Sequence, residues 1–300
     1  MKLLITGSSG LIGKRFLELH SNKFSEIYSL GRRKNPFNDV NHIYFDLSSL
    51  GRLELPQVDV VVHCAAQTSL VFDKREFLNN FNTNSFGTGN LLQACSRMGQ
   101  KPFFLNLGTA TQLGYTNKLY RMKDLPKDSP TTLYDISKLA GEMMLHNFCE
   151  LDLIRGCSLR LCNVYGNLNE RQKSDRGILD KIFRKCLLGK PVEILGDGTY
   201  LRDYIHLDDV CDAIYATLNS IKDCSNNTFY IGTGKSIRLK DAFSKLRNVA
   251  HKQNNVFSEF RYSQITKDIN IIHLRNFQAD ITEFSKKTGW APQRSISDLA

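Results

Sequence analysis

The first half of the chain alternates short apolar runs with segments of helical periodicity. Apolar runs cover residues 2–6, 26–30, 42–45, 58–63, 102–107 and 157–161. Amphipathic helical patterns cover residues 11–20, 83–98 and 133–150. Buried strands that alternate with helices are typical of parallel sheets with crossover connections. The pattern therefore predicts an α/β fold with a doubly wound parallel sheet.

The pattern changes after Gly166. A polar and charged stretch, NLNERQKSDRG, precedes a predicted helix, ILDKIFRKCLLG, and a turn-rich segment, EILGDGTYLRDY. The composition does not shift sharply enough to mark a linker. We therefore expect the second half of the chain to pack against the first.

Three glycines follow the first predicted strand. The segment LLITGSSGLIGKRF places Gly7, Gly10 and Gly13 between that strand and the next helix. Gly7 permits a tight turn, Gly10 lets the backbone approach a pyrophosphate, and Gly13 allows the helix to pack closely on the strand. The free N–H groups and the dipole at a helix N-terminus favour an anion. This Rossmann-type arrangement predicts a dinucleotide cofactor.

The end of the second predicted strand bears on which cofactor binds. An acidic residue there holds the ribose hydroxyls of NAD(H), whereas an arginine suits the 2′-phosphate of NADP(H). The segment YSLGRRKN offers Arg32 and Arg33 and no carboxylate. We therefore favour NADP(H), with NAD(H) as the alternative if both arginines are simply solvated.

Two hydroxyl groups and a lysine form the candidate catalytic set. Tyr134 and Lys138 are four residues apart on a predicted helix, so their side chains share one face. A nearby ammonium favours the phenolate and should bring the tyrosine pKa toward the range of a general acid or base. Thr109 ends the apolar run FFLNLG, at the carboxyl edge where parallel sheets bind ligands. We expect the hydroxyls of Thr109 and Tyr134 to meet at one substrate oxygen, while Lys138 can also hold a ribose hydroxyl.

Motifs along almost the whole chain resemble those of one known family. They are TGSSGLIG, FDL, VVHCAAQTS, NTNSFGTGNLLQAC, NLGTATQLG, YDISK, LRLCNVYG, LGDGTYLRDYIHLDDV, FYIGTGKSI and ADITEFSKKTGW. With these motifs the chain resembles the extended short-chain dehydrogenases/reductases, specifically the nucleotide-sugar epimerase/dehydratase/reductase family. The resemblance implies an NAD(P)-dependent enzyme that acts on a nucleotide-diphosphate sugar.

The resemblance also implies roles for individual residues. Beside Tyr134 and Lys138, the expected cofactor-binding residues are Gly7, Ser9, Gly10, Leu11, Ile12, Gly13, Arg32, Arg33, Asp46, Leu47, Cys64, Ala65, Ala66 and Asn84. The expected substrate-binding residues are Thr109, Thr111, Asn163 and Arg202, of which the last two would hold the diphosphate. Arginine suits phosphate because it binds through two parallel hydrogen bonds. The alternative for Arg202 is an ion pair with Asp203 or Asp208.

The domain organisation follows from the same resemblance. Residues 1–165 plus about 202–232 would form a dinucleotide-binding domain. Residues 166–201 plus 233–300 would form a smaller, interleaved substrate-binding domain, with the ligand in the cleft between them. Asp208 and Asp209 are expected to begin a helix rather than to catalyse, because acidic side chains favour helix N-termini. Members of the family are often dimers formed through two helices, so we expect a homodimer.

Three reactions are open to this family. A 4,6-dehydratase would carry an Asp-Glu pair after the catalytic threonine, where this chain has Ala110 and Thr111, so dehydration is disfavoured. A 4-epimerase would oxidise the sugar at carbon 4 and return the hydride, which requires tightly held NAD⁺. A 4-keto-sugar reductase would use NADPH, with Tyr134 protonating the ketone oxygen. Arg32 and Arg33 make the reductase our preferred hypothesis and the 4-epimerase the alternative.

Composition limits the other function classes. The net charge of +10 is spread along the chain, which favours a solvated basic surface over a nucleic-acid groove. A non-catalytic cofactor sensor or RNA-binding relative is therefore the less favoured reading. The eight cysteines lack metal-ligand spacing, so we expect reduced thiols and no metal site. No signal peptide or membrane-spanning run is visible, and we expect a cytoplasmic protein.

Overall fold

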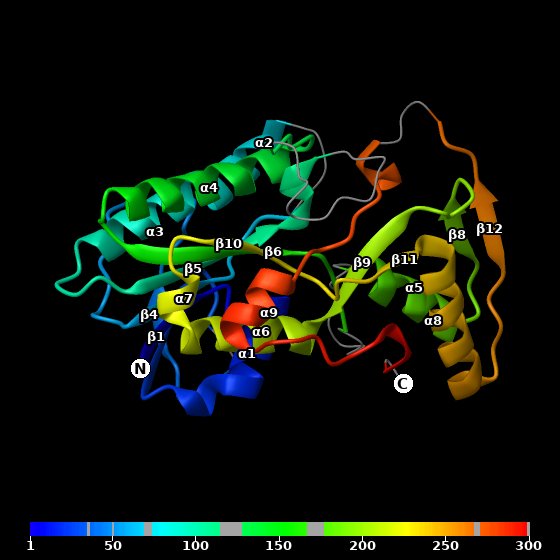
Figure 1. The fold of residues 1–300 in the computed structure, drawn as a ribbon, viewed down its shortest axis with the longest axis horizontal. Helices are drawn as coiled ribbons and strands as arrows, with labels where there is room; N and C mark the ends of the chain where they lie inside the picture. The colour runs from blue at the N-terminus through cyan, green and yellow to red at the C-terminus, as the bar shows by residue number, and fades with distance from the viewer. Residues whose placement is uncertain are drawn as a thin grey trace.

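Seven parallel strands form the main sheet of the computed structural model, which describes residues 1–34, 37–49, 51–68, 74–114, 128–166, 177–266 and 271–298. Their order across the sheet is β3-β2-β1-β4-β5-β6-β10 (Figure 1). The strands are β1 (Lys2–Thr6), β2 (Glu26–Gly31), β3 (Asn41–Tyr44), β4 (Val60–His63), β5 (Phe103–Thr109), β6 (Arg155–Leu161) and β10 (Thr228–Ile231). The winding reverses between β1 and β4, at the switch point where such sheets bind ligands. The predicted doubly wound parallel sheet is thus confirmed.

Helices cover both faces of this sheet. They are α1 (Leu11–His20), α2 (Lys74–Asn80), α3 (Gly87–Ser96), α4 (Leu133–Glu150), α6 (Leu207–Asn219), α7 (Ile221–Cys224) and α9 (Thr282–Thr288). Leu3 and Ile5 of β1 pack with Phe16 of α1, whereas Leu4 points to the opposite face and packs among apolar residues of α3 and α4. Figure 1 shows α2, α3 and α4 above the sheet and α1 and α6 below it. Because both faces are covered, the strands are continuously apolar.

The helix predicted at residues 83–98 begins earlier than its periodicity suggests. Residues 74–80 form α2, Phe81–Phe86 form a π-helix, and α3 follows directly. Asparagine is a weak helix former, and the segment LNNFNTN contains four of them, so the sequence gives no clear helix start here. Short π-helical turns inside α-helices occur frequently at functional sites. This turn carries Asn84, one of the predicted cofactor residues.

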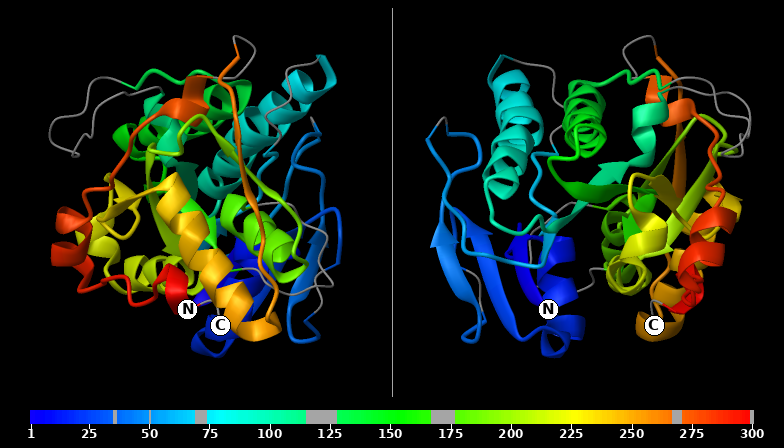
Figure 2. Two further views of the ribbon diagram at one scale, coloured as in Figure 1. Left: turned by 90° about the vertical axis from the view of Figure 1, so that its right-hand side faces the viewer. Right: turned by 60° about the vertical axis from the view of Figure 1, so that its left-hand side comes forward.

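A second region packs beside the main sheet. It contains β7 (Asn163–Tyr165), β8 (Val192–Leu195), β9 (Leu201–His206), β11 (Ser236–Arg238), β12 (Phe260–Ser263), α5 (Ile178–Leu187) and α8 (Leu239–Asn254). Phe183, Ile194 and Phe243 belong to its own apolar cluster. The left view of Figure 2 shows α8 and β12 in front, at the end of the molecule that is on the right in Figure 1. The polar loop predicted after Gly166 lies outside the described residues.

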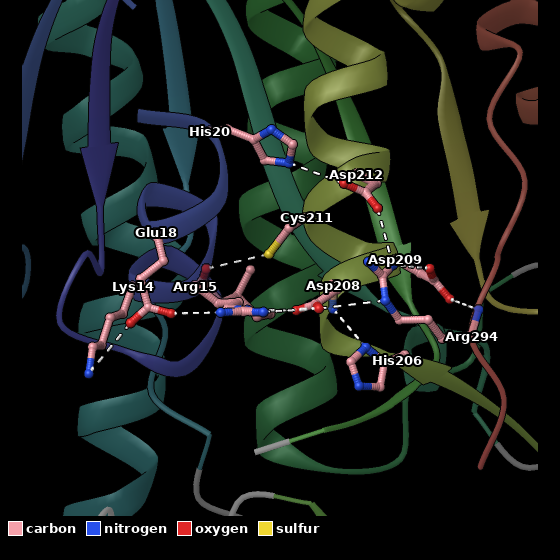
Figure 3. A network of polar contacts seen from close by, with 11 residues as sticks. Lys14, Arg15, Glu18, His20, His206, Asp208, Asp209, Cys211, Asp212 and Arg294 are labelled. Carbon is pink, nitrogen blue, oxygen red and sulfur yellow. Dashed lines mark hydrogen bonds and ion pairs between the residues drawn. The ribbon is translucent and has the colours of Figure 1, made fainter. Parts of the chain in front are cut away.

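A charged network fixes α1 against α6 (Figure 3). Arg15 on α1 donates to both carboxylate oxygens of Asp208, through Nε at 2.6 Å and Nη2 at 3.0 Å. Arg294, which follows α9, pairs with Asp209 at 2.7 Å and approaches Asp208 at 3.5 Å. Both aspartates lie in the first turn of α6, as predicted. The network therefore ties the helix that follows the glycine turn to the C-terminal segment.

Candidate active site

The glycine turn has the close contacts that a dinucleotide site requires. Gly7 has a φ of +69°, and a Cβ atom there would lie 2.8 Å from the backbone nitrogen of Ala65. A Cβ atom at Gly13 would lie 2.5 Å from the carbonyl oxygen of Gly7. Gly10 caps α1 without a side-chain hydrogen bond, so the first N–H groups of this helix, beginning at Leu11, are left for an external acceptor. The residues present thus fit the pyrophosphate of a dinucleotide.

We expect Gly13→Ala to disrupt cofactor binding. The added methyl group must displace the Gly7 carbonyl, and such overpacking costs about 1–3 kcal/mol, or roughly 10-fold or more in affinity. Fluorescence titration with NADH and NADPH measures this effect. Gly99→Ala is the matched control, because the nearest atom to its Cβ lies 3.8 Å away. Unchanged affinity in Gly13→Ala would place the cofactor elsewhere.

A buried histidine stands at the end of β4, beside the glycine turn. Thr88 donates through its hydroxyl to the carbonyl oxygen of Asn84 at 2.7 Å, so it accepts from His63 Nε2 at 3.0 Å. His63 Nδ1 then accepts from the Thr6 hydroxyl at 2.7 Å. Burial, helped by the charge of Lys138, lowers the pKa of His63 to about 3, so the ring is neutral. The histidine therefore fixes the carboxyl ends of β1 and β4 relative to one another.

The side chain of Asn84 joins the loop after β4 to α4. Its Oδ1 accepts from the backbone of Gln67 and its Nδ2 donates to the carbonyl of Gln67, both at 2.8 Å. Its Nδ2 also donates to Ser137 Oγ at 3.0 Å, and Ser137 donates to the carbonyl oxygen of Tyr134 at 2.8 Å. Asn84 thus orients the helix that carries the candidate catalytic pair. A direct contact between Asn84 and the cofactor stays a prediction.

Tyr134 and Lys138 lie one turn apart in the first half of α4, as the sequence predicts. Lys138 is only 3% exposed. Burial lowers its pKa from 10.5 to about 8, although the negative charge of Glu142 opposes this shift. An ammonium group at this position stabilises a neighbouring phenolate. The assistance of Lys138 in proton transfer at Tyr134 stays a prediction.

Thr109 ends β5 and is also the N-terminal cap of a short 3₁₀ helix, Ala110–Leu113. Its backbone N–H donates to the side chain of Gln112 at 2.8 Å. Thr111, two residues on, hydrogen-bonds to Asp135, which directly follows Tyr134 in α4. The structure thus brings the end of β5 and the start of α4 together. A substrate oxygen shared by Thr109 and Tyr134 stays a prediction.

The predicted adenosine side of the cofactor site lies at the ends of β2, β3 and β4. Arg32 follows β2, and its Nη1 lies 3.9 Å from Asp46 Oδ2, while its side chain remains 69% exposed. Arg33 is also exposed. Leu47 is buried, and Cys64, Ala65 and Ala66 follow β4. Asp46, which follows β3, therefore lies near the two arginines at the end of β2, and its contact with the cofactor stays a prediction.

Arg202 is buried on β9, and it pairs with neither predicted acid within the described residues. It donates to the backbone carbonyl oxygens of Leu201 at 3.1 Å and His273 at 2.6 Å, and also to that of Arg275. Asp203 instead accepts backbone N–H groups, including that of Thr233 at 2.7 Å. The charge of Arg202 is therefore not neutralised by an adjacent carboxylate. Asn163, the other predicted diphosphate ligand, is half-buried at the start of β7.

The sequence analysis missed Arg275. Its side chain is 94% buried, and among the described residues its Nε and Nη1 atoms have no hydrogen-bond partner. Burial and the nearby charge of Arg202 lower its pKa to about 10, whereas the charge of Asp135 opposes this shift. Buried donors without partners are costly, so this pair of arginines favours an anionic ligand. The available sequence signal was an arginine inside the apolar segment IIHLRNF.

The described ranges also bear on metal sites, membrane-spanning helices and cysteine chemistry. There, no group of three or more His, Cys, Asp or Glu residues could hold a metal ion. Within the same ranges, no helix is long and apolar enough to cross a membrane. All eight cysteines are free thiols, and seven of them are buried.

Comparison with known proteins gives consistent matches. A sequence model described as the NAD dependent epimerase/dehydratase family matches residues 3–232. A putative UDP-glucose 4-epimerase of Methanocaldococcus jannaschii is 26% identical over 308 residues, covering 99% of this chain and 95% of the relative. The UDP-glucose 4-epimerase of Thermotoga maritima, solved with UDP-glucose, is 25% identical with a TM-score of 0.83, covering 100% of this chain and 96% of that one. MoeE5, solved with UDP-glucuronic acid and NAD, matches with the same four values.

Proposed function

Because the chain belongs to the NAD dependent epimerase/dehydratase family, we propose that it is a 4-epimerase of a UDP-hexose with NAD as resident cofactor. The observation that carries this proposal is the set of Thr109, Tyr134 and Lys138 beside a glycine turn that fits a dinucleotide. The similarity of the whole chain to 4-epimerases favours epimerisation over the ketone reduction that we preferred from the sequence. Ala110 and Thr111 supply no acid for dehydration.

In the proposed reaction Tyr134, Lys138 and Thr109 have separate roles. Tyr134 accepts the proton of the sugar 4-hydroxyl, and the ammonium of Lys138 stabilises the phenolate from which it starts. Thr109 hydrogen-bonds the same oxygen and orients it. A nicotinamide held beside these residues would supply reversible hydride transfer at carbon 4. Tyr134 gives back the proton when the hydride returns to the opposite face of the keto sugar.

Arg202 and Arg275 would hold the diphosphate of the substrate. Both guanidinium groups are buried, and phosphate oxygens would satisfy the Nε and Nη1 atoms of Arg275, which have no partner among the described residues. In this proposal residues 166–201 and 233–300 form the substrate-binding domain, and Arg202 borders it from β9. Two of the similar proteins were solved with a UDP sugar, which supports UDP as the nucleotide.

A 4-keto-sugar reductase that uses NADPH is the second candidate. The observation that favours it is the pair Arg32 and Arg33 at the end of β2, where a 2′-phosphate would bind. The argument for a 2′-phosphate is weakened because Arg32 Nη1 already lies 3.9 Å from the carboxylate oxygen Oδ2 of Asp46. NAD is therefore our proposal for the resident cofactor.

One assay separates the two candidates. Purified protein is incubated without added cofactor with UDP-glucose, UDP-galactose or UDP-glucuronate, and both C4 epimers are quantified by chromatography. Interconversion of any such pair, with NAD released on denaturation, supports the epimerase. An empty protein that oxidises NADPH with a UDP-4-keto sugar, and interconverts none of the pairs, would support the reductase instead.

We further propose that the chain forms a homodimer through α3 and α4. Ile136 and Met143, two turns apart on α4, are exposed by 38% and 62%, and Phe86, at the end of the π-helix that packs against α4, is exposed by 60%. An exposed apolar face of this kind is typical of an interface. Met143→Glu should therefore convert dimer to monomer in analytical ultracentrifugation, whereas Leu188→Glu at the end of α5 should not. A monomeric wild-type protein would refute the proposal.

The cytoplasm is the proposed location. The eight free thiols support it, because reducing compartments keep cysteines in this form.

A further inference from the structure

The segment that carries Arg275 takes the place of a strand beside β9. β9 has β11 on one side and β7 on the other, but β7 pairs with it only at residues 204–206. The start of β9 is instead covered by the irregular segment that precedes α9. Phe277 in this segment donates its backbone N–H to the carbonyl oxygen of Leu201 at 3.1 Å. The segment thus extends the sheet although it is not one of its strands.

Asn276 changes the hydrogen-bond pattern at this edge. Leu201 donates its backbone N–H to Asn276 Oδ1 at 2.8 Å. In a regular parallel ladder of the same register, the carbonyl oxygen of Arg275 would accept that N–H. The side-chain oxygen therefore leaves this carbonyl available to Arg202, which donates to it through Nη1. Nη2 of Arg202 donates to the carbonyl oxygen of His273 at 2.6 Å, so this guanidinium clamps the backbone that carries Arg275.

Arg275 depends on these contacts more than Arg202 does. Arg202 lies on the central strand of the sheet β11-β9-β7 and is paired with Ile237 of β11, so its position does not require Asn276. The segment of Arg275 belongs to no sheet among the described residues, and its contacts with β9 hold its backbone. An arginine that binds phosphate through two parallel hydrogen bonds must keep a fixed orientation.

We propose that Asn276 is a positioning residue that holds Arg275 in the orientation required to bind the substrate diphosphate. This inference rests on the proposed function, which assigns Arg275 to the diphosphate. Without the amide of Asn276, the N–H of Leu201 either stays unpaired or takes the carbonyl of Arg275 away from Arg202. Either outcome loosens the segment, and the guanidinium of Arg275 with it.

A purely structural contribution of Asn276 is the competing explanation. Such a contribution would change UDP binding equally, whether or not position 275 carries an arginine. An effect that passes through Arg275 disappears when that arginine is absent. A double-mutant cycle at positions 275 and 276 therefore separates the two explanations.

The readout is the dissociation constant of UDP, measured by calorimetry with the NAD-loaded protein. Arg275→Met removes the guanidinium and should weaken UDP binding by about 10- to 100-fold, the effect of lost hydrogen bonds to a charged group. Asn276→Ala should weaken it by roughly 3- to 10-fold, the effect of one net hydrogen bond. In the Arg275→Met background, Asn276→Ala should have no further effect.

Steady-state kinetics give an independent check. Asn276→Ala should raise the KM for the UDP-hexose by the same factor and leave kcat unchanged, because Thr109, Tyr134 and Lys138 are untouched. Asn276→Ser, whose hydroxyl is one bond shorter than the amide, serves if Asn276→Ala folds poorly. Asn254→Ala, at the exposed end of α8, is the matched control and should leave UDP binding unchanged.

The failures of this inference and of the proposed function are distinguishable. An equal loss from Asn276→Ala in both backgrounds, or no loss in either, would overturn the role of Asn276 alone. A fall in kcat with an unchanged KM would do the same. Unchanged UDP binding in Arg275→Met would overturn the assignment of Arg275 to the diphosphate and this inference together.

Discussion

Tyr134→Phe is expected to lower kcat by about 10²- to 10⁴-fold, the usual contribution of a positioned acid or base. The substitution removes one oxygen and keeps the ring, so α4 should fold normally. Lys138, Asn84 and the glycine turn are untouched. Cofactor binding should therefore be retained, and the loss should appear in the rate of hydride transfer.

Stopped-flow measurement of nicotinamide reduction, after mixing with the UDP-hexose, tests this directly. Tyr262→Phe on β12 is the matched control, because its side chain is 60% exposed and lies in the second region. Full activity in Tyr134→Phe would exclude this tyrosine as the acid/base. Loss of cofactor together with activity would indicate a structural role instead.

The cofactor was the part of the site that could be predicted most directly from the sequence. Family membership identifies the chain as an enzyme with a nicotinamide cofactor, in agreement with the dinucleotide predicted from Gly7, Gly10 and Gly13. These glycines are constrained by contacts within a few residues and by one neighbouring strand. A local pattern of this kind is fully visible in the sequence. The alternation of apolar strands and helices predicted the sheet for the same reason.

The residues that sequence reasoning missed depend on contacts between distant segments. Arg275 lies beside Arg202 in space, but more than a whole helix and several strands separate the two residues along the chain. The sequence around Arg275 contains no motif. Asp135 looks like an ordinary helix cap until Thr111 approaches it from the end of β5. The link between Arg160 on β6 and Glu142 on α4 is of the same kind. Periodicity predicts elements, but it does not predict which polar side chains they bring together.

The buried ion pair between Arg160 and Glu142 supports the largest stability effect that we expect. Arg160 Nη2 lies 2.5 Å from Glu142 Oε1, and Glu142 is only 2% exposed. Arg160 also donates to both carboxylate oxygens of Asp128 and to the hydroxyl of Tyr230 at 3.0 Å. Ser158 donates to Glu142 Oε2 at 2.7 Å. Every strong donor and acceptor of this buried pair is therefore satisfied.

Glu142→Gln should lower the free energy of unfolding by about 1.5–3 kcal/mol, because it removes the charged hydrogen bonds to Glu142 while Asp128 still pairs with Arg160. Urea denaturation followed by circular dichroism measures the change. Glu150→Gln, at the exposed end of the same helix, is the control and should change stability by less than about 0.5 kcal/mol. A loss below about 1 kcal/mol in Glu142→Gln would mean that the ion pair contributes little.

The pH dependence of the same variant provides a second check. Burial opposes ionisation of Glu142, but the hydrogen bonds and charge of Arg160 hold its pKa below the ordinary value of 4.5. Its stabilising effect is thus complete above pH 4.5 and disappears as the pH falls through the lower folded-state value. The stability difference between wild type and Glu142→Gln should therefore shrink on acidification.

The charge of Glu142 also raises the pKa of Lys138 against the effect of burial, so the Glu142→Gln variant should lose part of its activity at neutral pH as Lys138 deprotonates.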